Sequence, residues 1–443
     1  MSRTVEGDVN LSLRRNAWRA GLGPAASELL TEDERWFLRQ SLSTPCLDGL
    51  TSARGATLTD LDGRVIFDFH GNSVHQVGYG HPRVIAAISA AMAELPFSPR
   101  RYTNRHAVDL ARRLAQLAPG GPRKVLFAPG GAEAVSMALK LARTATGRHK
   151  TLSMWDSFHG ATLDAISVGG EAIFRRNIGP LLPGTEHVPP LDLAERFFGP
   201  DRPFERFADF IDYVLGSEGD FAALIAEPIR WTTVFRPPDG FWARVRESCT
   251  RHGTLLIFDE VPSGLGRTGT MFAHEQVGAV PDMLVLGKGL GGGIMPLAAL
   301  IADARLDVGA EAALGHFTHE KSPVAAAAAL ATLDIIAEEN LLERAKTVGE
   351  RGRERLTEMS RRFDCLGAVR QVGAYFGLEI TAASPVAAAD RADAILYAAL
   401  RHGLSFKVGG GNIVTLCPPL TITEAELDSA FDRLEAAVAS NAG

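Results

Sequence analysis

Short apolar runs alternate with segments of helical periodicity through the middle of the chain. Six runs have the length and composition of buried strands: Lys124–Pro129, Thr151–Trp155, Phe221–Pro228, Thr254–Val261, Met283–Leu290 and Pro296–Asp303. Helical spacing of apolar residues marks four segments among them: Pro82–Leu95, His106–Ala118, Ala132–Ala145 and Gly240–His252. This alternation is typical of a mostly parallel sheet covered by helices, so we predict an α/β fold.

The pattern changes after Pro323. We expect a long helix through the charged segment 338–362, then a short α+β region with helices at 389–403 and 423–440. The last of these begins with a capping box, Thr423 to Glu426. The predicted organisation has three parts: an N-terminal segment, 1–58, that packs with the small domain or a partner subunit, a large domain, 59–325, and a small C-terminal domain, 326–443.

Composition excludes several classes of partner. The 443 residues are 46% hydrophobic and 22% charged, as in soluble globular enzymes. A net charge of −6 without a long basic run makes nucleic acid an unexpected partner. The most apolar stretch, 323–336, meets Asp334 well short of the roughly 20 apolar residues of a membrane span. Residues 1–18 carry no apolar run of a signal peptide, and four scattered cysteines form no C-x-x-C pair, so we expect a reduced, cytoplasmic protein.

A lysine stands among glycines at the end of one predicted strand. Lys288, in LGKGLGGG, is placed where ligands collect at the carboxyl ends of strands. Desolvation would make its amine a nucleophile toward a carbonyl carbon, as a Schiff base requires. Taken alone, a solvated loop lysine is the more common explanation.

Asp259 ends the strand that precedes Lys288 by 29 residues. A carboxylate there could hold a metal, orient a histidine, pair with a protonated pyridine nitrogen, or cap the next turn. The pyridine pairing fits together with Lys288, because a pyridoxal phosphate enzyme needs a lysine and an acidic partner for the ring.

Two loops complete the candidate site. The turn APGGAEA joins a strand to a helix, so free amides and the helix dipole converge on Gly130, Gly131 and Ala132, which is the arrangement of a phosphate cradle. A glycine turn without a ligand is the commoner explanation for any single such loop. In SFHGATL, Phe158 and His159 follow another strand end, where an aromatic ring could cover a flat cofactor or simply pack in the core.

Together these motifs resemble the class III aminotransferases, pyridoxal phosphate enzymes of fold type I, from LDGRVIFDFHGNSVHQVGYGHPRV to CPPLTI. The resemblance implies a large domain with a mostly parallel seven-stranded sheet and a smaller α+β C-terminal domain. It implies Lys288 as the Schiff-base lysine, Asp259 on the pyridine nitrogen, Phe158 on the ring face, and the amides of 130–132 on the phosphate. We also place His159 and Glu227 among the cofactor-binding residues. Thr318 would reach the phosphate from the neighbouring subunit, so a homodimer with shared active sites follows.

The chain departs from the family pattern where members bind the carboxylate of 2-oxoglutarate. The usual E-P-x-Q-G-E reads Glu227-Pro228-Ile229-Arg230-Trp231-Thr232, so Thr232 replaces a glutamate that gates an arginine. The arginine itself is replaced by Thr415. Loss of both is hard to reconcile with ordinary 2-oxoglutarate transamination. Pro262 and Gly130 also replace the usual glutamine and serine near the cofactor, but backbone amides remain, so we expect pyridoxal phosphate still to bind.

Lyases of this family release ammonia without a keto-acid acceptor and need no such arginine. The segments FHGNSVHQVGYGHP and HFTHEKSP are most similar to the (R)-1-hydroxy-2-aminoethylphosphonate ammonia-lyases, which implies a phosphonylated or phosphorylated amine substrate. A phosphonate needs charged donors. Arg230 is the first candidate; Arg101, His75, Lys407 and Lys321 are weaker ones, each of which could instead be solvated surface.

Two alternatives to the lyase stay open: a transaminase of ω-amine or 4-aminobutyrate-like substrates, and a decayed protein that only binds ligands. We expect no metal site, because His316 and His319 have metal-like spacing but no third ligand nearby in the sequence.

Overall fold

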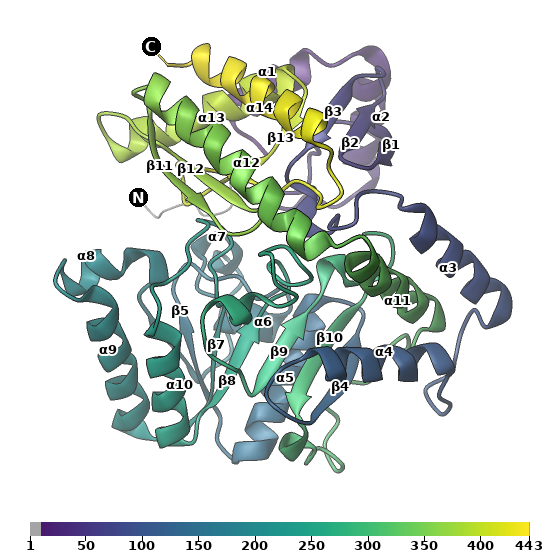
Figure 1. Cartoon of the computed structure of the whole chain (residues 1–443), viewed down its shortest axis with the longest axis vertical. Helices are drawn as coiled ribbons and strands as arrows, with labels where there is room; N and C mark the ends of the chain where they lie inside the picture. The colour runs from purple at the N-terminus through teal and green to yellow at the C-terminus, as the bar shows by residue number, and fades with distance from the viewer. Residues whose placement is uncertain (1–9, 443) are drawn as a thin grey trace.

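The computed structural model describes residues 10–442, and a seven-stranded sheet is the framework of its larger part (Figure 1). The strand order is β4-β10-β9-β8-β7-β5-β6. The strands are β4 (Arg123–Ala128), β5 (Lys150–Met154), β6 (Thr185–Val188), β7 (Phe221–Ala226), β8 (Leu255–Asp259), β9 (Met283–Leu286) and β10 (Ala298–Asp303). Only β10 runs antiparallel to its neighbours. The predicted fold class and all six predicted strands are confirmed, and β6 is additional.

Helices cover both faces of this sheet, as β8 shows. Leu256 and Phe258 share an apolar cluster with Trp242 of α10, whereas Leu255 and Ile257 belong to a second cluster with α5. Because successive strand side chains point to opposite faces, both faces are buried. The helices of this part are α3 (Pro82–Glu94), α4 (Arg105–Leu117), α5 (Gly131–Thr146), α6 (Leu163–Val168), α7 (Ala172–Arg175), α8 (Ala194–Phe198), α9 (Pro203–Glu218) and α10 (Phe241–His252), with 3₁₀ turns η2 (Leu191–Leu193), η3 (Ala273–Gln276) and η5 (Ala304–Leu306).

The C-terminal part contains an antiparallel sheet of order β11-β12-β15-β14. Its strands are β11 (Leu366–Gln371), β12 (Phe376–Ile380), β14 (Lys407–Gly409) and β15 (Ile413–Leu416), with helices α11 (Pro323–Glu338), α12 (Leu341–Arg362), α13 (Pro385–Arg401) and α14 (Glu424–Ala439). The single long helix expected from 338 to 362 is wrong at its start. Asn340 takes a left-handed conformation, with φ of 50°, so α11 ends and α12 begins there. The capping box of Thr423 and Glu426 is confirmed.

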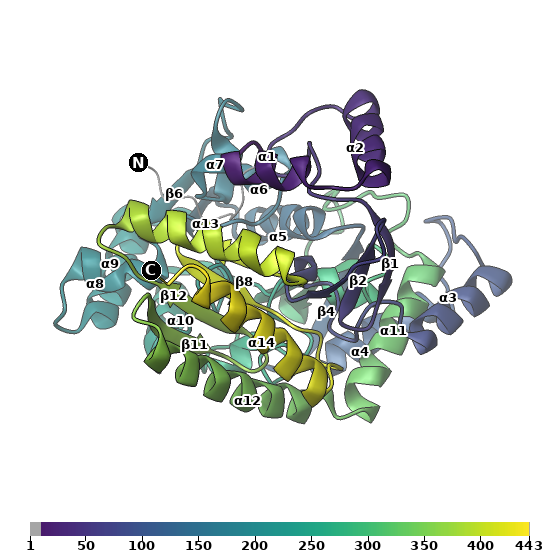
Figure 2. The same ribbon diagram turned by 90° about the horizontal axis from the view of Figure 1, so that it is seen from above.

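The N-terminal region lies against the C-terminal part (Figure 2). It contains α1 (Leu13–Ala20), α2 (Pro24–Trp36), β1 (Leu50–Arg54), β2 (Thr57–Asp60) and β3 (Val65–Asp68), and β3 pairs with β13 (Leu404–Ser405) in a sheet of order β1-β2-β3-β13. Arg14 of α1 forms ion pairs with Asp390 and Asp393 of α13, at 2.7 and 2.9 Å. The boundaries expected at 58/59 and 325/326 fall inside β2 and α11.

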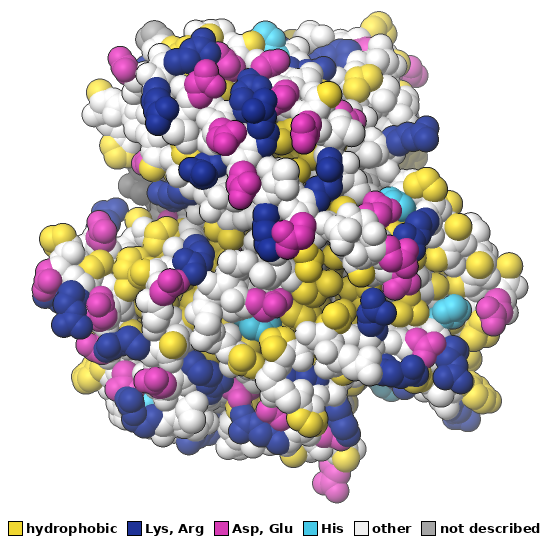
Figure 3. Space-filling model, in the orientation of Figure 1, with side chains coloured by type: hydrophobic (Ala, Val, Ile, Leu, Met, Phe, Trp, Pro, Cys, Tyr) yellow, Lys and Arg dark blue, Asp and Glu magenta, His cyan; other side chains and the backbone are white. Residues whose placement is uncertain are grey.

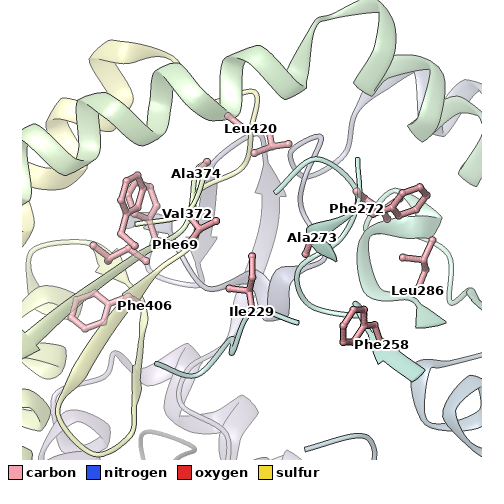
Figure 4. Close-up of a cluster of buried hydrophobic side chains, with 14 of the residues drawn as sticks. Phe69, Ile229, Phe258, Phe272, Ala273, Leu286, Val372, Ala374, Phe406 and Leu420 are labelled. Atoms are coloured by element: carbon pink, nitrogen blue, oxygen red, sulfur yellow. The ribbon is translucent and has the colours of Figure 1, made fainter. Parts of the chain in front are cut away.

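The two parts share a buried apolar core at their junction (Figure 4). Phe258 and Leu286 reach it from the large sheet, Ile229 from the loop after β7, and Phe69 and Phe406 from the segments around β3 and β13. This junction lies at the carboxyl ends of the parallel strands, where ligand sites form in open α/β sheets. On the surface in view, basic and acidic side chains are interspersed (Figure 3).

Candidate active site

A cavity of about 450 Å³ opens where the carboxyl ends of β7, β8 and β9 meet the C-terminal part. Its lining brings together residues far apart in the sequence: Gly131, Ala132, Phe158, His159, Asp259 and Lys288. Glu227 and Lys407 also line it. Eight of the candidate cofactor- and substrate-binding residues therefore converge on one space, together with Thr232 and Pro262.

Asp259 is the buried acid of this cavity, 3% exposed at the end of β8. Its Oδ2 accepts a hydrogen bond from Nδ1 of His159 at 2.8 Å, and its Oδ1 accepts one from the amide of Val261 at 3.0 Å. Among residues 10–442 no group of three or more histidine, cysteine, aspartate or glutamate side chains is arranged to hold a metal ion. The hydrogen bond from His159 shows that Asp259 orients a histidine, one of the roles considered for it from the sequence. A carboxylate fixed by two donors in a buried site is a strong acceptor for a further charged N–H, as a protonated pyridine nitrogen provides.

The N-terminus of α5 forms the second wall. Gly130 is its N-cap, in extended conformation, without a side-chain cap for the first free amides. The backbone of Gly131 lies against Val261, since an added Cβ would come within 3.1 Å of that side chain. An added Cβ at Gly160 would likewise come within 2.7 Å of the Ala132 Cα. Uncapped amides at a helix start, held close by glycines, suit the phosphate of the cofactor.

Lys288 begins the 3₁₀ turn η4 (Lys288–Gly291), with one residue between it and β9. It lines the cavity and is exposed there, so the protein alone does not desolvate its amine as the sequence led us to expect. Its φ of 46° is left-handed, a conformation that costs about 1–3 kcal/mol in a residue other than glycine. Gly289 next to it allows Gln76 to approach, because a Cβ at that position would collide with the Gln76 amide. Strain of this kind concentrates at functional sites.

Two aromatic rings and a glutamate form the remaining wall near the cofactor position. Phe158 packs on Phe174 of α7 with ring centroids 4.3 Å apart, and both line the cavity. Glu227 follows β7, and its Oε2 accepts the amide hydrogen of Trp231 at 2.7 Å. Burial raises the pKa of Glu227, while the nearby Arg230 and the Trp231 amide act in the opposite direction. Pyridoxal phosphate fits this combination of groups. Asp259 would be the acidic partner for the ring, the uncapped N-terminus of α5 suits the phosphate, Lys288 would be the Schiff-base lysine, and Phe158 would be the aromatic ring for the cofactor face.

The structure separates the candidates for the substrate anion. Lys407 of β14 lines the cavity. Arg230, the first candidate, does not: its side chain is buried, with Nε 3.4 Å from Asp192 Oδ1, and it donates to the backbone carbonyl of Asp156. The Arg230 guanidinium is therefore held by the buried Asp192 carboxylate and the Asp156 carbonyl, so it links two loops of the large part and does not face the cavity.

The other candidates also lie outside the cavity lining. His75 is fully buried, with Nε2 3.0 Å from the Asp68 carbonyl oxygen, and burial lowers its pKa to about 4. Arg101 is exposed. Lys321 lines a separate pocket beside α4. Thr318 is exposed on the loop before α11, away from the cavity of its own chain.

Several cavity residues were missed by sequence reasoning, four of them with large or polar side chains: His70, Asn72, Phe174 and Trp231. His70 and Asn72 come from a turn in which Gly71, Asn72 and Ser73 all have positive φ, between 45° and 60°. Phe174 sits on the short helix α7, for which the sequence offered no periodic signal. Trp231 had a signal, because it replaces the glycine of the family stretch E-P-x-Q-G-E.

Comparison with known proteins places the chain in a family. The family model described as Aminotransferase class-III matches residues 41–438, so the chain belongs to the class III aminotransferases and is a pyridoxal-phosphate-dependent enzyme. It is 45% identical to the (R)-1-hydroxy-2-aminoethylphosphonate ammonia-lyase of Vibrio splendidus (strain 12B01), over 98% of this chain and 95% of that protein. It is 33% identical to an isoleucine 2-epimerase of Lentilactobacillus buchneri, over 93% and 94% of the two chains.

A solved structure shows the same fold. An omega transaminase from Pseudomonas jessenii in complex with PMP superposes with a TM-score of 0.86 at 27% identity, covering 93% of this chain and 98% of that one. Within residues 10–442 no helix has the length and apolar character to span a membrane.

Proposed function

We propose that this protein is a pyridoxal-phosphate-dependent ammonia-lyase that converts (R)-1-hydroxy-2-aminoethylphosphonate to phosphonoacetaldehyde and ammonia. The observation that carries the proposal is the pair of threonines at the substrate end of the site. Thr232 lines the cavity and Thr415 is buried on β15, where related transaminases have the glutamate and arginine that handle a keto-acid carboxylate. The relative of 45% identity supports the substrate.

Each residue of the site has a place in this reaction. Bound pyridoxal phosphate supplies a ring that stores the electron pair left when a proton is removed beside the substrate nitrogen. Asp259, oriented by His159, would accept the pyridine N–H, the amides of 130–132 would hold the phosphate, and Phe158 would cover the ring. Glu227 stands at the cavity wall as a further cofactor contact.

Lys288 would move the proton. Its amine accepts the proton from the carbon that bears nitrogen, and the hydroxyl leaves from the neighbouring carbon as that electron pair forms the new double bond. The released enamine takes up a proton and is hydrolysed to the aldehyde and ammonia. The water lost with the hydroxyl equals the water used in hydrolysis, so no oxidant or acceptor is needed.

Lys407 is the residue we assign to the phosphonate. It is the cavity lysine other than Lys288, and it lies on the strand next to Thr415. Opposed residues of antiparallel strands project to the same face of the sheet, so Lys407 offers a cation on the face where the family arginine would stand.

We also propose a homodimer in which Thr318 reaches the phosphate in the partner's site. Its exposed position, outside the cavity of its own chain, supports this arrangement. The cytoplasmic location expected from the sequence stays a prediction.

The likeness to an omega transaminase makes an ω-amine transaminase the second candidate. Purified holoenzyme incubated separately with the (R) and (S) forms of 1-hydroxy-2-aminoethylphosphonate, and with 2-aminoethylphosphonate, separates the two. A lyase releases ammonia and aldehyde from one hydroxylated enantiomer and none from the compound without a leaving group. Equal processing of 2-aminoethylphosphonate, dependent on added keto acid, would establish the transaminase instead.

A further inference from the structure

The Trp231 indole forms one wall of the cavity beyond the cofactor residues, and a second aromatic ring packs behind it. The rings of Trp231 and Tyr375 stack with centroids 3.8 Å apart and planes 11° from parallel. Trp231 is 8% exposed and lines the cavity, and Tyr375 behind it is 1% exposed. Val234 and Cys417 complete the buried cluster around them. Because Tyr375 is itself packed on all sides, it holds the Trp231 indole in place from the side away from the cavity.

The backbone of Trp231 is fixed equally firmly. Its turn closes through hydrogen bonds between Arg230 and Phe235, at 2.9 and 3.1 Å, and its amide donates to Glu227. Gly409 of β14 presses on this turn, because a Cβ there would collide with the carbonyl of Thr232. The strand that carries Lys407 thus packs directly on the turn that carries Trp231.

The family stretch E-P-x-Q-G-E has a glycine at the position of Trp231. The indole accordingly occupies space that a glycine leaves open, beside Thr232 and close to the strand of Lys407. The cavity of about 450 Å³ must hold the cofactor as well as the substrate. The Trp231 indole therefore reduces the length of substrate chain that the cavity can accommodate.

We propose that Trp231 is a specificity-determining residue that limits the substrate to a two-carbon chain between amine and phosphonate. Its indole, backed by Tyr375, closes the end of the site against longer ω-aminoalkyl anions and against dicarboxylates. This inference rests on the proposed function, since the phosphonate defines which end of the substrate meets this wall.

The test is a binding series that needs no turnover. Holoenzyme is titrated with 2-aminoethylphosphonate, 3-aminopropylphosphonate and 4-aminobutylphosphonate, and the change in cofactor absorbance gives each Kd. Wild type should bind the two-carbon ligand most tightly. Trp231→Gly should bind the four-carbon ligand at least about tenfold more tightly than wild type does, the gain expected from burying two further methylenes.

Three further variants complete the test: a conservative replacement, a second disruptive variant and a surface control. Trp231→Phe keeps a ring on Tyr375 and should keep the wild-type order of affinities. Tyr375→Leu removes the support behind the indole and should shift the order in the same direction as Trp231→Gly, which keeps the test available if the glycine variant fails to fold. Trp36→Ala, at a side chain 71% exposed on α2, should change nothing.

The outcomes separate the inference from the function on which it rests. If folded Trp231→Gly and Tyr375→Leu both keep the wild-type preference for the short ligand, the inference is wrong, whatever the reaction. If wild type releases no ammonia from the hydroxylated phosphonate, the proposed function fails, and a wild-type preference for the two-carbon ligand that Trp231→Gly abolishes would still support Trp231 as the wall.

Discussion

Thr415 and Lys407 are direct partners in the antiparallel pair of β15 and β14, and the Thr415 hydroxyl donates to the Lys407 carbonyl oxygen at 3.0 Å. Thr415 stands where related transaminases place the arginine that binds a carboxylate. In this protein the positive charge is carried by Lys407 on the neighbouring strand β14, on the same face of the sheet. A lysine presents a compact ammonium with three N–H donors in place of the planar guanidinium fork of an arginine.

Lys407→Met should raise KM for the phosphonate substrate with a smaller effect on kcat. A hydrogen bond to a charged group contributes about 1.5–3 kcal/mol, which corresponds to roughly 10- to 150-fold in KM. Steady-state kinetics measure the change, with Lys124→Met, at a lysine 61% exposed on β4, as the matched control. An unchanged KM in Lys407→Met would remove Lys407 from the substrate site.

Arg230→Met should lower the stability of the fold and leave KM nearly unchanged, the opposite of Lys407→Met. Asp192 would lose the buried guanidinium beside it, and breaking a buried ion pair costs about 3–5 kcal/mol. We expect a lower free energy of unfolding in denaturant titrations, with partial recovery in Arg230→Met/Asp192→Asn and little change in KM. A tenfold rise in KM at full stability would instead return Arg230 to the role first expected from the sequence.

His159 is a positioning residue for Asp259 through their contact of 2.8 Å. His159→Leu removes a donor to a buried carboxylate and should weaken cofactor binding by about 1.5–3 kcal/mol. His159→Asn, whose amide can donate in place of Nδ1, should retain most of the affinity. Equilibrium dialysis of the cofactor and the pH midpoint of its absorbance check both, and equal behaviour of the two variants would show that the hydrogen bond is unimportant.

His75 should make the protein less stable in acid. Its folded-state pKa of about 4 lies below the ordinary value of 6.5, because burial disfavours the charged ring. The unfolded chain therefore binds a proton first as pH falls. Stability is complete above pH 6.5 and is lost progressively toward pH 4, by about 3 kcal/mol.

His75→Gln should flatten this dependence. The measurement is the free energy of unfolding of wild type and variant between pH 7 and pH 4, with His149→Gln, at a side chain 71% exposed, as the control. The partly buried His187, whose pKa burial also lowers to about 4, contributes equally to all three proteins. A slope in His75→Gln as steep as that of wild type would contradict the assignment.

Subunit mixing tests the shared site. Lys288→Ala should abolish turnover, and Thr318→Asp should impair phosphate binding through charge repulsion. In a mixed dimer, the site with an intact Lys288 would receive an intact Thr318 from the other chain, so activity should return to at most half of wild type per site. If Thr318 acts within its own chain, mixing restores nothing.

Much of the framework could be predicted because buried strands are long apolar runs. Residues 255–259 and 283–286 are such runs, and Asp259 and Lys288 lie where these two runs end. The strand Thr185–Val188 was missed because TEHV is polar and lies at the sheet edge. The break at Asn340 was missed because the flanking sequence keeps its helical composition.

The substrate end of the site was harder to predict, since it depends on which buried charge finds a partner. Arg230 and Lys407 are both plausible cations in the sequence, but only the fold brings Asp192 to Arg230 and sets Lys407 opposite Thr415. Trp231 was visible as a departure from the family pattern, yet its stacking on Tyr375, 144 positions away, needs the tertiary structure.

The most direct test of the central claim is the number of turnovers without any keto acid. Holoenzyme is mixed with an excess of (R)-1-hydroxy-2-aminoethylphosphonate, and ammonia, phosphonoacetaldehyde and the cofactor spectrum are followed together. We predict many equivalents of both products per active site, with the cofactor still pyridoxal phosphate at the end. One equivalent followed by arrest as pyridoxamine phosphate, with turnover resumed only on addition of a keto acid or aldehyde, would contradict the lyase assignment.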